Sequence, residues 1–424
     1  MTYIAVLRRF NLNVRLFLVG AAIIGLTNFG GIFAALFNLY LLRLGYGTQF
    51  IGTVNAIGAF ALVATCWPAS ALERRFGSRN LILAGLVLNI VSSVLIQAAV
   101  FIPVVWRAEY ILVFYALNSI GLALYLVNSQ PFLAAATTSA ERGHAFSVQA
   151  ALWPLSGFAG SLLGGMIPGL ITRLTGIPLT GPGPYQLTLW ISSVLSVFAF
   201  VIMLPTRQPP PDSPQYTHPN PVQPGIAQRQ TTSALFLGLS PYKIIALLSI
   251  VVAVQITGEG SVRAFMNVYL DNALSLPTTW IGLILGLGQL GAGLAALLTP
   301  FFTARMGNAL TYVLFSLAIS LCMLPLIFIP TWYGAGLGFM GTIMMVQIAR
   351  PALITIQMES ISPAYRAPMS AATTMTASFS MGLIGLLGGY MIPSYGYPAF
   401  FLIGAWLTAL AALGFWLYLR MLRV

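Results

Sequence analysis

The sequence predicts an all-α membrane protein in which twelve transmembrane helices form two pseudo-symmetric six-helix bundles. Three observations predict this fold class. Of 424 residues, 58% are apolar and only 6% are charged, a balance typical of integral membrane proteins. Apolar stretches long enough to cross a bilayer recur along the chain, and the second half repeats residues of the first. We therefore expect a lipid bilayer to surround most of the protein.

Stretches of roughly 20 or more mostly apolar residues match the length that a helix needs to cross about 30 Å of hydrocarbon. We expect twelve such helices, six in each half. In the first half they fall at residues 14–43, 49–71, 80–102, 110–136, 145–172 and 185–204. In the second half they fall at residues 242–270, 279–303, 309–329, 333–357, 368–392 and 398–419.

The two halves share residues at a nearly constant separation. It is 229 to 230 residues near the start of each half and 220 to 224 further on, because loop lengths differ. A repeat of this length exceeds the units of solenoid proteins, which run about 20 to 50 residues, and it is typical of membrane proteins built from two related halves. The matched pairs include Asn38 and Asn267, Tyr40 and Tyr269, Gly52 and Gly282, Arg75 and Arg305, Gly77 and Gly307, Pro131 and Pro351, Arg142 and Arg366, and Gly165 and Gly389.

A proline-rich segment separates the halves. Residues 205–224 hold eight prolines mixed with polar residues, a composition that predicts an extended linker. We therefore expect an N-terminal bundle at 1–204, a cytoplasmic linker at 205–240 and a C-terminal bundle at 241–424.

The formal charge of +12 reports membrane topology. With the N-terminus placed inside, 14 of the 19 Lys and Arg residues fall on cytoplasmic segments, whereas Arg43, Arg107 and Arg173 lie outside. This asymmetry follows the positive-inside rule. It predicts a multi-pass protein of the cytoplasmic (inner) membrane with both termini in the cytoplasm, and it gives no reason to expect a nucleic-acid partner.

The sequence shows no cluster of His, Cys and carboxylate residues of the kind that binds a metal or supplies a catalytic nucleophile. His144 and His218 fall in predicted loops, and Cys66 and Cys322 fall in spans of opposite halves. A zinc site or a nucleophilic enzyme needs a cluster of such side chains. We expect no metal, no cofactor and no enzymatic activity.

Residues 70–79, which read SALERRFGSR, resemble the signature of the major facilitator superfamily in the loop between helices 2 and 3, G-x-L-a-D-r-x-G-r-r. Four positions match, at Leu72, Arg75, Gly77 and Arg79. Arg74 stands at the acidic position of the signature, and Glu73 lies one residue earlier. In the family this loop forms a cytoplasmic latch. The resemblance therefore implies a latch built from Glu73, Arg74, Arg75, Gly77 and Arg79, with Arg305 and Gly307 in the second half.

Residues 156–165, which read SGFAGSLLGG, are similar to the helix 5 motif of the family's antiporters, g-x-x-x-G-P-x-x-G-G. Ser161 replaces the proline of that motif, and Leu117 replaces the arginine of a third motif in helix 4. Small residues at this spacing let helices approach closely in lipid. We expect such helix packing at Gly160, Gly164 and Gly165, and at Gly388 and Gly389 in the second half.

With the twelve spans, the linker and the duplication, the chain resembles a twelve-helix major facilitator of the bacterial type. The resemblance implies a secondary active transporter that moves a small-molecule substrate by alternating access. It also implies that helices 1, 4, 7 and 10 line the central cavity.

Charged residues inside the spans are few and belong to the second half. Glu259 and Arg263 fall in the seventh span and Arg350 in the tenth. A charge at the middle of the bilayer costs on the order of 3 kcal/mol, which makes such residues candidates for function. Gln255 and Asn267 extend the first pair into one helical face with a period of four residues. We expect these five residues to serve proton coupling or substrate binding.

Two hypotheses assign a role to these charges. In the first, Glu259 is a protonation site whose carboxylate is held by Arg263 or Arg350, because burial favours the neutral acid and a nearby cation favours the ionised form. In the second, the excess positive charge of these residues clamps an anionic group of the substrate. The structural alternative is a simple i, i+4 pair of Glu259 with Arg263, with Arg350 bonded to backbone carbonyls.

The first half offers neutral groups at the corresponding positions. Gly30 and Ala34 stand opposite Glu259 and Arg263 in the repeat, and Gln130 stands opposite Arg350. An aromatic stripe that includes Phe33 suits an amphipathic substrate if it faces the cavity. The residues that we expect to line the cavity are Asn28, Phe33, Asn38, Asn118, Asn128 and Gln130, and in the tenth span Gln347.

The mechanism that these features favour is proton-coupled efflux of a small amphipathic compound by a monomeric antiporter. Uptake or exchange of an organic anion and lipid translocation are the alternatives within transport. A non-transporting receptor or scaffold on the same fold is the alternative from another class.

Overall fold

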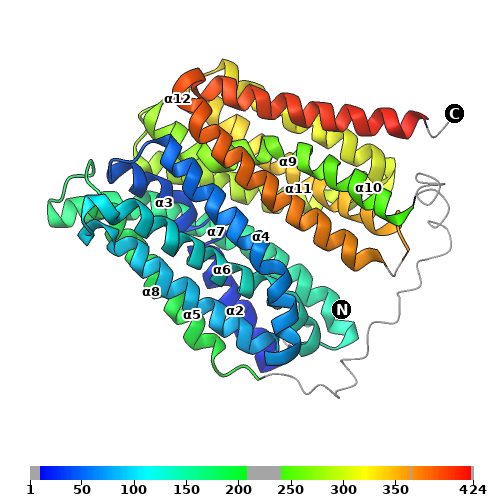
Figure 1. Cartoon of the computed structure of the whole chain (residues 1–424), viewed down its shortest axis with the longest axis horizontal. Coiled ribbons are helices and arrows are strands. Elements are labelled where there is room, and N and C mark those ends of the chain that lie inside the picture. The colour runs from blue at the N-terminus through cyan, green and yellow to red at the C-terminus, as the bar shows by residue number, and fades with distance from the viewer. Residues whose placement is uncertain (1–9, 208–239, 363–364, 422–424) are drawn as a thin grey trace. The chain divides into compact units, whose positions relative to one another are not determined.

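The computed structural model describes residues 10–207, 240–362 and 365–421, and these residues are helical apart from short connections (Figure 1). The helices before the linker are α2 (Leu12–Thr27), α3 (Ile32–Arg43), α4 (Thr48–Phe76), α5 (Ser78–Gln97), η1 (Ala98–Phe101), α6 (Val104–Ala136), α7 (Ser139–Thr175) and α8 (Gly183–Met203). The helices after it are α9 (Pro241–Asn272), α10 (Thr278–Phe328), α11 (Trp332–Glu359) and α12 (Arg366–Met421). Of the predicted linker, residues 208–239 lie outside the described part of the chain.

Ten helices of the described residues are long and apolar enough to cross a membrane, with α2 and α3 counted as one span. Two of the ten are interrupted by a glycine with non-helical dihedral angles. Gly307 (φ 74°, ψ 164°) divides α10, and Gly396 (φ 78°, ψ 169°) divides α12. Both joints fall between neighbouring predicted spans. The helical membrane fold is therefore confirmed, while the count of twelve stays a prediction.

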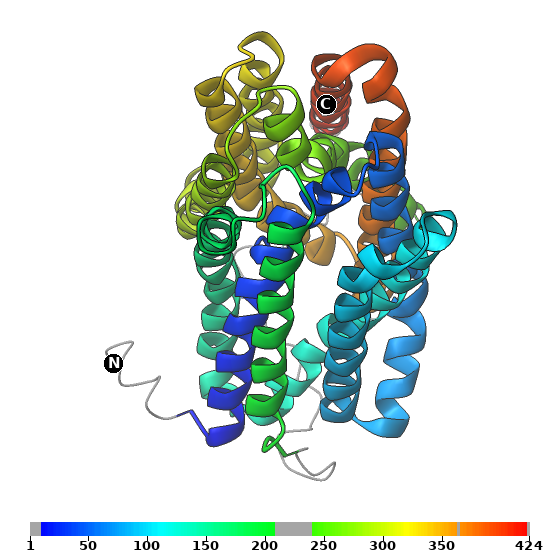
Figure 2. The same cartoon turned by 90° about the vertical axis from the view of Figure 1, so that its left-hand side faces the viewer.

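The chain divides into two compact units, Met1–His218 with Pro277–Gly286 and Pro219–Leu276 with Leu287–Val424. In the first unit α2 packs against α7 and α8, and its close approach to α8 is visible in Figure 2. Phe17 on α2 contacts Phe132 on α6 with ring centroids 5.3 Å apart. In the second unit α9 packs against α11 and α12, where Phe265 meets Phe400 edge to face at 5.5 Å.

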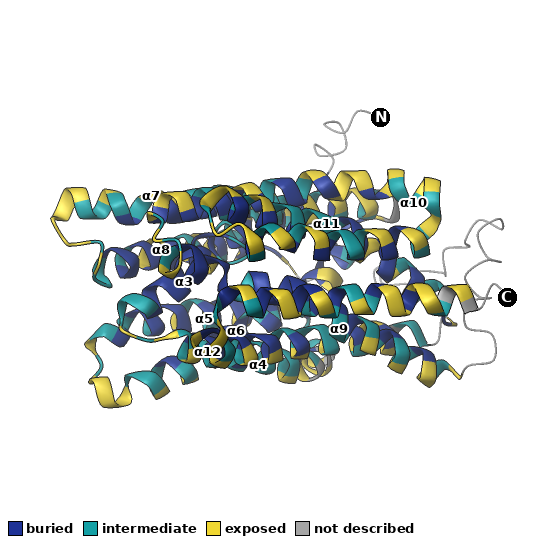
Figure 3. Cartoon of the chain, turned by 90° about the horizontal axis from the view of Figure 1, so that it is seen from above, coloured by how far each residue is buried: buried dark blue, intermediate teal, exposed yellow. Residues whose placement is uncertain are grey.

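Side chains that face away from these contacts are apolar and exposed, as expected for a surface in contact with lipid. Val194, Phe198 and Val201 lie on such a face of α8. Figure 3 shows exposed and buried positions recurring along single helices, as one buried and one outward face require. In lipid the association of helices depends on packing and hydrogen bonding, because lipid tails are as apolar as the side chains.

The duplication in the sequence reappears in the backbone. Gly77, which joins α4 to α5, has φ 80° and ψ 149°, close to the values of its repeat partner Gly307. Gly45 has φ 91°, and Ser275 at the equivalent position of the second half has φ 52°. Positive φ values are readily adopted by glycine and disfavoured for other residues. The same helix connections therefore occur in both halves.

A repeated arginine also has the same role in both halves. Arg142 donates to the carbonyl oxygen of Ala134 at 3.1 Å, and Arg366 donates to the carbonyl oxygen of Met358 at 3.0 Å. Each acceptor lies eight residues earlier, at the end of the preceding helix. The last carbonyls of a helix lack partners within it, so a cation there satisfies them and interacts well with the helix dipole.

Candidate functional site

Helix α9 brings the predicted polar face into the interior of its unit. The helix begins with Pro241 in its first turn, where the fixed φ of proline favours helix formation. Gln255, Glu259 and Asn267 are buried, and Arg263 is partly buried. Among the described residues Glu259 is the one charged residue in the buried class.

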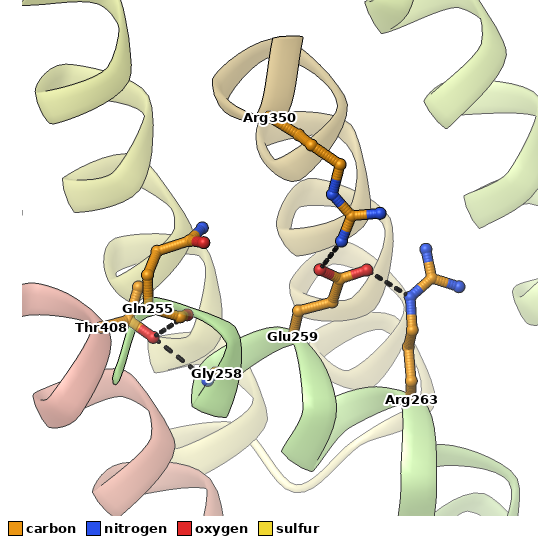
Figure 4. A network of polar contacts seen from close by, with 6 residues as sticks. All are labelled: Gln255, Gly258, Glu259, Arg263, Arg350 and Thr408. Carbon is orange, nitrogen blue, oxygen red and sulfur yellow. Dashed lines mark hydrogen bonds and ion pairs between the residues drawn. The ribbon is translucent and has the colours of Figure 1, made fainter. Parts of the chain in front are cut away.

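An ion cluster forms around the Glu259 carboxylate (Figure 4). Arg263 donates from Nε to Oε1 at 2.7 Å, and Arg350, which α11 supplies, donates from Nη2 to Oε2 at 2.5 Å. Each carboxylate oxygen thus has its own guanidinium. Both arginines of the first hypothesis hold the carboxylate, and Arg350 bonds to it rather than to backbone carbonyls as the structural alternative supposed.

The cluster is buried on one side and accessible on the other. The Glu259 side chain is 4% exposed, whereas those of Arg263 and Arg350 are 29% and 46% exposed. Within the described residues each guanidinium makes a single hydrogen bond, so its remaining N–H groups have no protein acceptor. Two cations against one carboxylate leave the cluster with a formal charge of +1.

Thr408 on α12 holds the turn of α9 that leads into Glu259. Its hydroxyl donates to the carbonyl oxygen of Gln255 and accepts from the backbone N–H of Gly258, each at 3.1 Å (Figure 4). Thr408 is fully buried, and Gly258 lies directly against it and against Gly404. A side chain at position 258 would collide with the Thr408 hydroxyl. This contact therefore sets the position of the backbone from which Glu259 projects.

The remaining second-half candidates lie on the same two helices as the cluster. Asn267 is eight residues beyond Glu259, about 12 Å along a helix, where its side-chain oxygen accepts from the Val268 N–H at 3.0 Å. Gln347 is partly buried on α11, and its backbone oxygen accepts from Thr299 at 3.4 Å. Gln255 meets Thr408 through its backbone oxygen. Their roles in binding stay predictions.

In the first unit Asn118 joins two helices, and Phe33 belongs to an aromatic stack. Asn118 on α6 donates to the Asn89 carbonyl at 3.0 Å, and Asn89 on α5 donates back at 3.3 Å. The rings of Phe33 and Phe37 stack at 4.8 Å, and Phe37 stacks on Tyr115 at 4.9 Å.

The other neutral candidates of this unit differ in their surroundings. Asn28 donates to the Thr27 hydroxyl at 2.9 Å, and Asn128 donates to the Leu124 carbonyl at 2.7 Å. Asn38 is buried, and Gln130, the repeat partner of Arg350, is exposed. Cavity lining by this set therefore stays a prediction.

The segment that resembles the family latch contains a helix joint and a helix cap. Gly77 forms the joint, and its N–H bonds to the Glu73 carbonyl. Arg79 donates to the Leu204 carbonyl at 2.7 Å and also to the Thr206 carbonyl, beyond the end of α8.

Two further arginines of the latch rest on aromatic rings. Arg75 lies over Phe76 at 5.4 Å, and Arg305 lies over Phe301 at 4.1 Å. The Arg74 side chain lies outside the described part. A charge latch in this segment stays a prediction.

The glycine motif packs α7 against a break in the first span that the sequence did not predict. Helix α2 ends at Thr27 and α3 begins at Ile32, with Gly30 at φ 71° between them. Gly160 faces the backbone of Leu26 and Gly31, and Ser161 donates to the Gly30 carbonyl at 2.5 Å. Adjacent glycines at 30 and 31 are the signal that indicates such a break.

The rest of the motif packs within its own unit as well. Gly164 lies against Ile32, and Gly165 lies against Gly282. In the second unit Gly388 lies against the rings of Phe265 and Phe400. Gly389 follows it on the same helix.

Comparison with known proteins identifies the fold and the family of this chain. The model of the Major Facilitator Superfamily matches residues 16–385. A mutant form of the nucleoside transporter NupG has a similar structure, with a TM-score of 0.74 and 16% identity over 96% of this chain and 100% of that one. Another NupG structure gives a TM-score of 0.64 and 17% identity over 96% and 98% of the two chains.

A bacterial homologue of the human lysosomal transporter Spinster, in an inward-facing and occupied conformation, gives a TM-score of 0.64 with 13% identity over 96% of this chain and 94% of that one. At these identities the likeness supports the fold alone. No curated protein matches this sequence. The family match covers most of the chain, so this multi-pass membrane protein belongs to the major facilitator superfamily.

Proposed function

We propose that the chain is a proton-coupled secondary transporter of a small amphipathic solute, in which Glu259 is the protonation site. The observation that carries the proposal is a single buried carboxylate held between guanidiniums of two helices, Arg263 of α9 and Arg350 of α11. A residue whose charge is balanced by partners on different helices can convert proton binding into helix movement.

Protonation of Glu259 removes the negative charge that both arginines bind. Each charge-assisted hydrogen bond contributes about 1.5–3 kcal/mol, so losing two changes the free energy by about 3–6 kcal/mol. A change of about 5.5 kcal/mol moves a two-state equilibrium from 1:99 to 99:1. Only the Arg350 bond joins two helices, so its release contributes at most about 1.5–3 kcal/mol, a bias of about 10- to 150-fold, and solvent at the half-exposed guanidinium lowers that value.

The topology that the sequence predicts completes the proposal. We propose that the protein acts as a monomer in the cytoplasmic membrane. Both termini lie in the cytoplasm in this proposal, because arginines gather on the segments assigned to that side. The direction of transport follows from the effect of the substrate on Glu259. A substrate that displaces the proton gives antiport and efflux, whereas one that binds together with the proton gives symport and uptake.

The test is flux in proteoliposomes loaded with a pH-sensitive dye. The solutes are small amphipathic compounds and include nucleosides, because two of the similar structures are of a nucleoside transporter. We expect flux by the unsubstituted protein to respond to an imposed pH gradient, and flux by Glu259→Gln to lose that response. Glu109→Gln, which alters an exposed carboxylate, is the control. An unchanged pH response in Glu259→Gln excludes the proposed role.

A further inference from the structure

We infer that the outer N–H groups of Arg263 and Arg350 bind an anionic group of the substrate, and that this substrate is an organic carboxylate. The inference rests on the proposed transport function and specifies the substrate class. The ion cluster uses one nitrogen of each guanidinium and leaves the others as possible donors to a ligand.

Both guanidiniums present free donors beside the same carboxylate. Arg263 bonds to Glu259 through Nε, so its two Nη nitrogens have no acceptor among the described residues. Arg350 bonds through Nη2, which leaves its Nε and Nη1 without one. The two arginines contact the two oxygens of one carboxyl group, so their guanidinium groups lie near each other (Figure 4).

The exposure of the cluster leaves these donors within reach of a ligand. Arg263 and Arg350 are 29% and 46% exposed, whereas the carboxylate behind them is 4% exposed. The uncompensated charge of +1 is costly inside a membrane unless an anion balances it. It disfavours a cationic solute at the same place. A monovalent anion brings the cluster to neutrality while Glu259 is ionised, and it lowers the charge from +2 to +1 when Glu259 is protonated.

The donors also have the shape that a carboxylate requires. The guanidinium group is planar and presents paired N–H groups that match the two oxygens of a carboxylate. The unused Nη pair of Arg263 is such a face. A neutral amide of the same shape lacks the charge and presents an N–H group where the carboxylate has its second oxygen, so it pairs poorly with two donors.

Anion binding and proton binding are linked through Glu259. The charged groups that act on this residue are Arg350 and Arg263. Helix α12, packed on the other side, presents the Thr408 hydroxyl at this level, and its described cations Arg366 and Arg420 lie at its two ends. A bound anion competes with Glu259 for both guanidiniums and so favours the protonated acid, and protonation frees the guanidiniums for the anion.

This reciprocity gives the coupling its sign. An anion and a proton that favour each other's binding cross the membrane in the same direction. The cluster therefore points to symport, and to uptake of an organic anion rather than efflux when the proton gradient is directed inward.

The test is calorimetric titration of the purified full-length chain with benzoate and with benzamide, its neutral isostere, at fixed ionic strength. Titrations in two buffers of different ionisation enthalpy count the protons taken up. We expect benzoate to bind more tightly than benzamide and to bring proton uptake. Arg263→Gln and Arg350→Gln each weaken benzoate binding about tenfold or more.

Two further variants complete the design. Glu259→Gln removes the competitor, so it binds benzoate more tightly and without proton uptake. Arg173→Gln, at an exposed arginine outside the cluster, binds benzoate as the unsubstituted protein does. Thermal unfolding identifies variants that fail to fold. If Arg350→Gln fails to fold, Arg350→Lys replaces it, because lysine keeps the charge and lacks the planar guanidinium group. We expect Arg350→Lys to bind benzoate more weakly than the unsubstituted chain.

Equal affinity for benzoate and benzamide, or unchanged benzoate affinity in the folded arginine variants, overturns the inference. Flux of a neutral solute distinguishes this failure from failure of the proposed function. In one outcome, flux depends on the pH gradient through Glu259, but benzoate affinity is unchanged in the arginine variants. That outcome supports the proton-coupling role of Glu259 and rejects the anion site. In the other outcome, both arginine variants weaken benzoate binding, but flux by Glu259→Gln keeps its response to the pH gradient. That outcome supports the anion site and rejects the coupling role of Glu259.

Discussion

The two halves of the sequence repeat each other, yet the two units differ in the polar groups that they bury. In the first unit Tyr40 donates to the Gln97 carbonyl at 3.0 Å, within a network of neutral amides and hydroxyls. In the second unit its repeat partner Tyr269 packs on the ring of Phe401 at 5.5 Å, and the charged Glu259 is buried among neutral polar residues. Neutral networks hold helices in register at any pH. A charged centre can respond to a proton, so we propose that coupling belongs to the second unit.

The largest effect is expected where helix packing involves backbone. Gly160→Ala places a methyl group against the backbone of Leu26 and Gly31, which cannot move aside, and we expect it to lower the free energy of unfolding by about 2 kcal/mol or more. Gly388→Ala meets the side chains of Phe265 and Phe400 instead and costs less. Thermal unfolding measures both. The control is Gly169→Ala, where nothing lies near the added methyl group, and equal losses at Gly160 and Gly169 would contradict the packing role.

A second prediction separates stability from pH response. Asn118→Ala removes the side-chain donor of the Asn89 carbonyl and with it a hydrogen bond between α6 and α5, which costs about 1 kcal/mol of stability. Flux by this variant keeps its dependence on the pH gradient, because Asn118 belongs to a neutral contact. Glu259→Gln is expected to lose the pH response, and it also weakens two charge-assisted hydrogen bonds, so its stability falls as well. An altered pH response in Asn118→Ala argues against the division of roles.

A third prediction concerns the contact behind the charged cluster. Thr408→Val keeps the shape of the side chain and removes two hydrogen bonds to α9, each worth about 1 kcal/mol. We expect the pH at which flux is half-maximal to shift, because the backbone that carries Glu259 is no longer held. Thr408→Ser retains the hydroxyl and should restore the original value. If Val and Ser behave alike, the hydroxyl does not position Glu259.

The smallest effect is expected at a connection that the halves share. Ser275 has φ 52° where Gly45 has φ 91°, so Ser275→Gly should relieve strain and raise stability by about 1 kcal/mol. Gly45→Ser should lower stability by a similar amount. Differential scanning calorimetry of the two variants checks the pair, and changes of the same sign would show that the connections are not equivalent.

Much of the fold is predictable from the sequence because its causes are local. Apolar length predicts the membrane spans, and the repeat predicts equivalent connections such as those at Gly77 and Gly307. The pairing of Glu259 with Arg263 is also local, since residues four apart share a helical face. Arg350 is predicted as a functional residue because a charge inside a membrane span is costly and is expected to have a partner.

Other features depend on the register between helices that lie far apart in the sequence. Thr408 contacts Gln255 across 153 residues, and nothing distinguishes it in the sequence from other threonines in apolar spans. The pairing of Asn118 with Asn89 requires α5 and α6 to meet at one particular level. Both contacts follow from tertiary packing, for which helix periodicity gives no register.

The central claim is that Glu259 exchanges a proton while its arginine partners remain charged. Infrared difference spectroscopy of the reconstituted protein at two pH values measures this directly, through the carbonyl stretch of a protonated carboxyl group. We predict a band that appears on acidification, is missing from Glu259→Gln and is altered in Arg350→Gln. A spectrum of Glu259→Gln identical to that of the unsubstituted protein would contradict the claim.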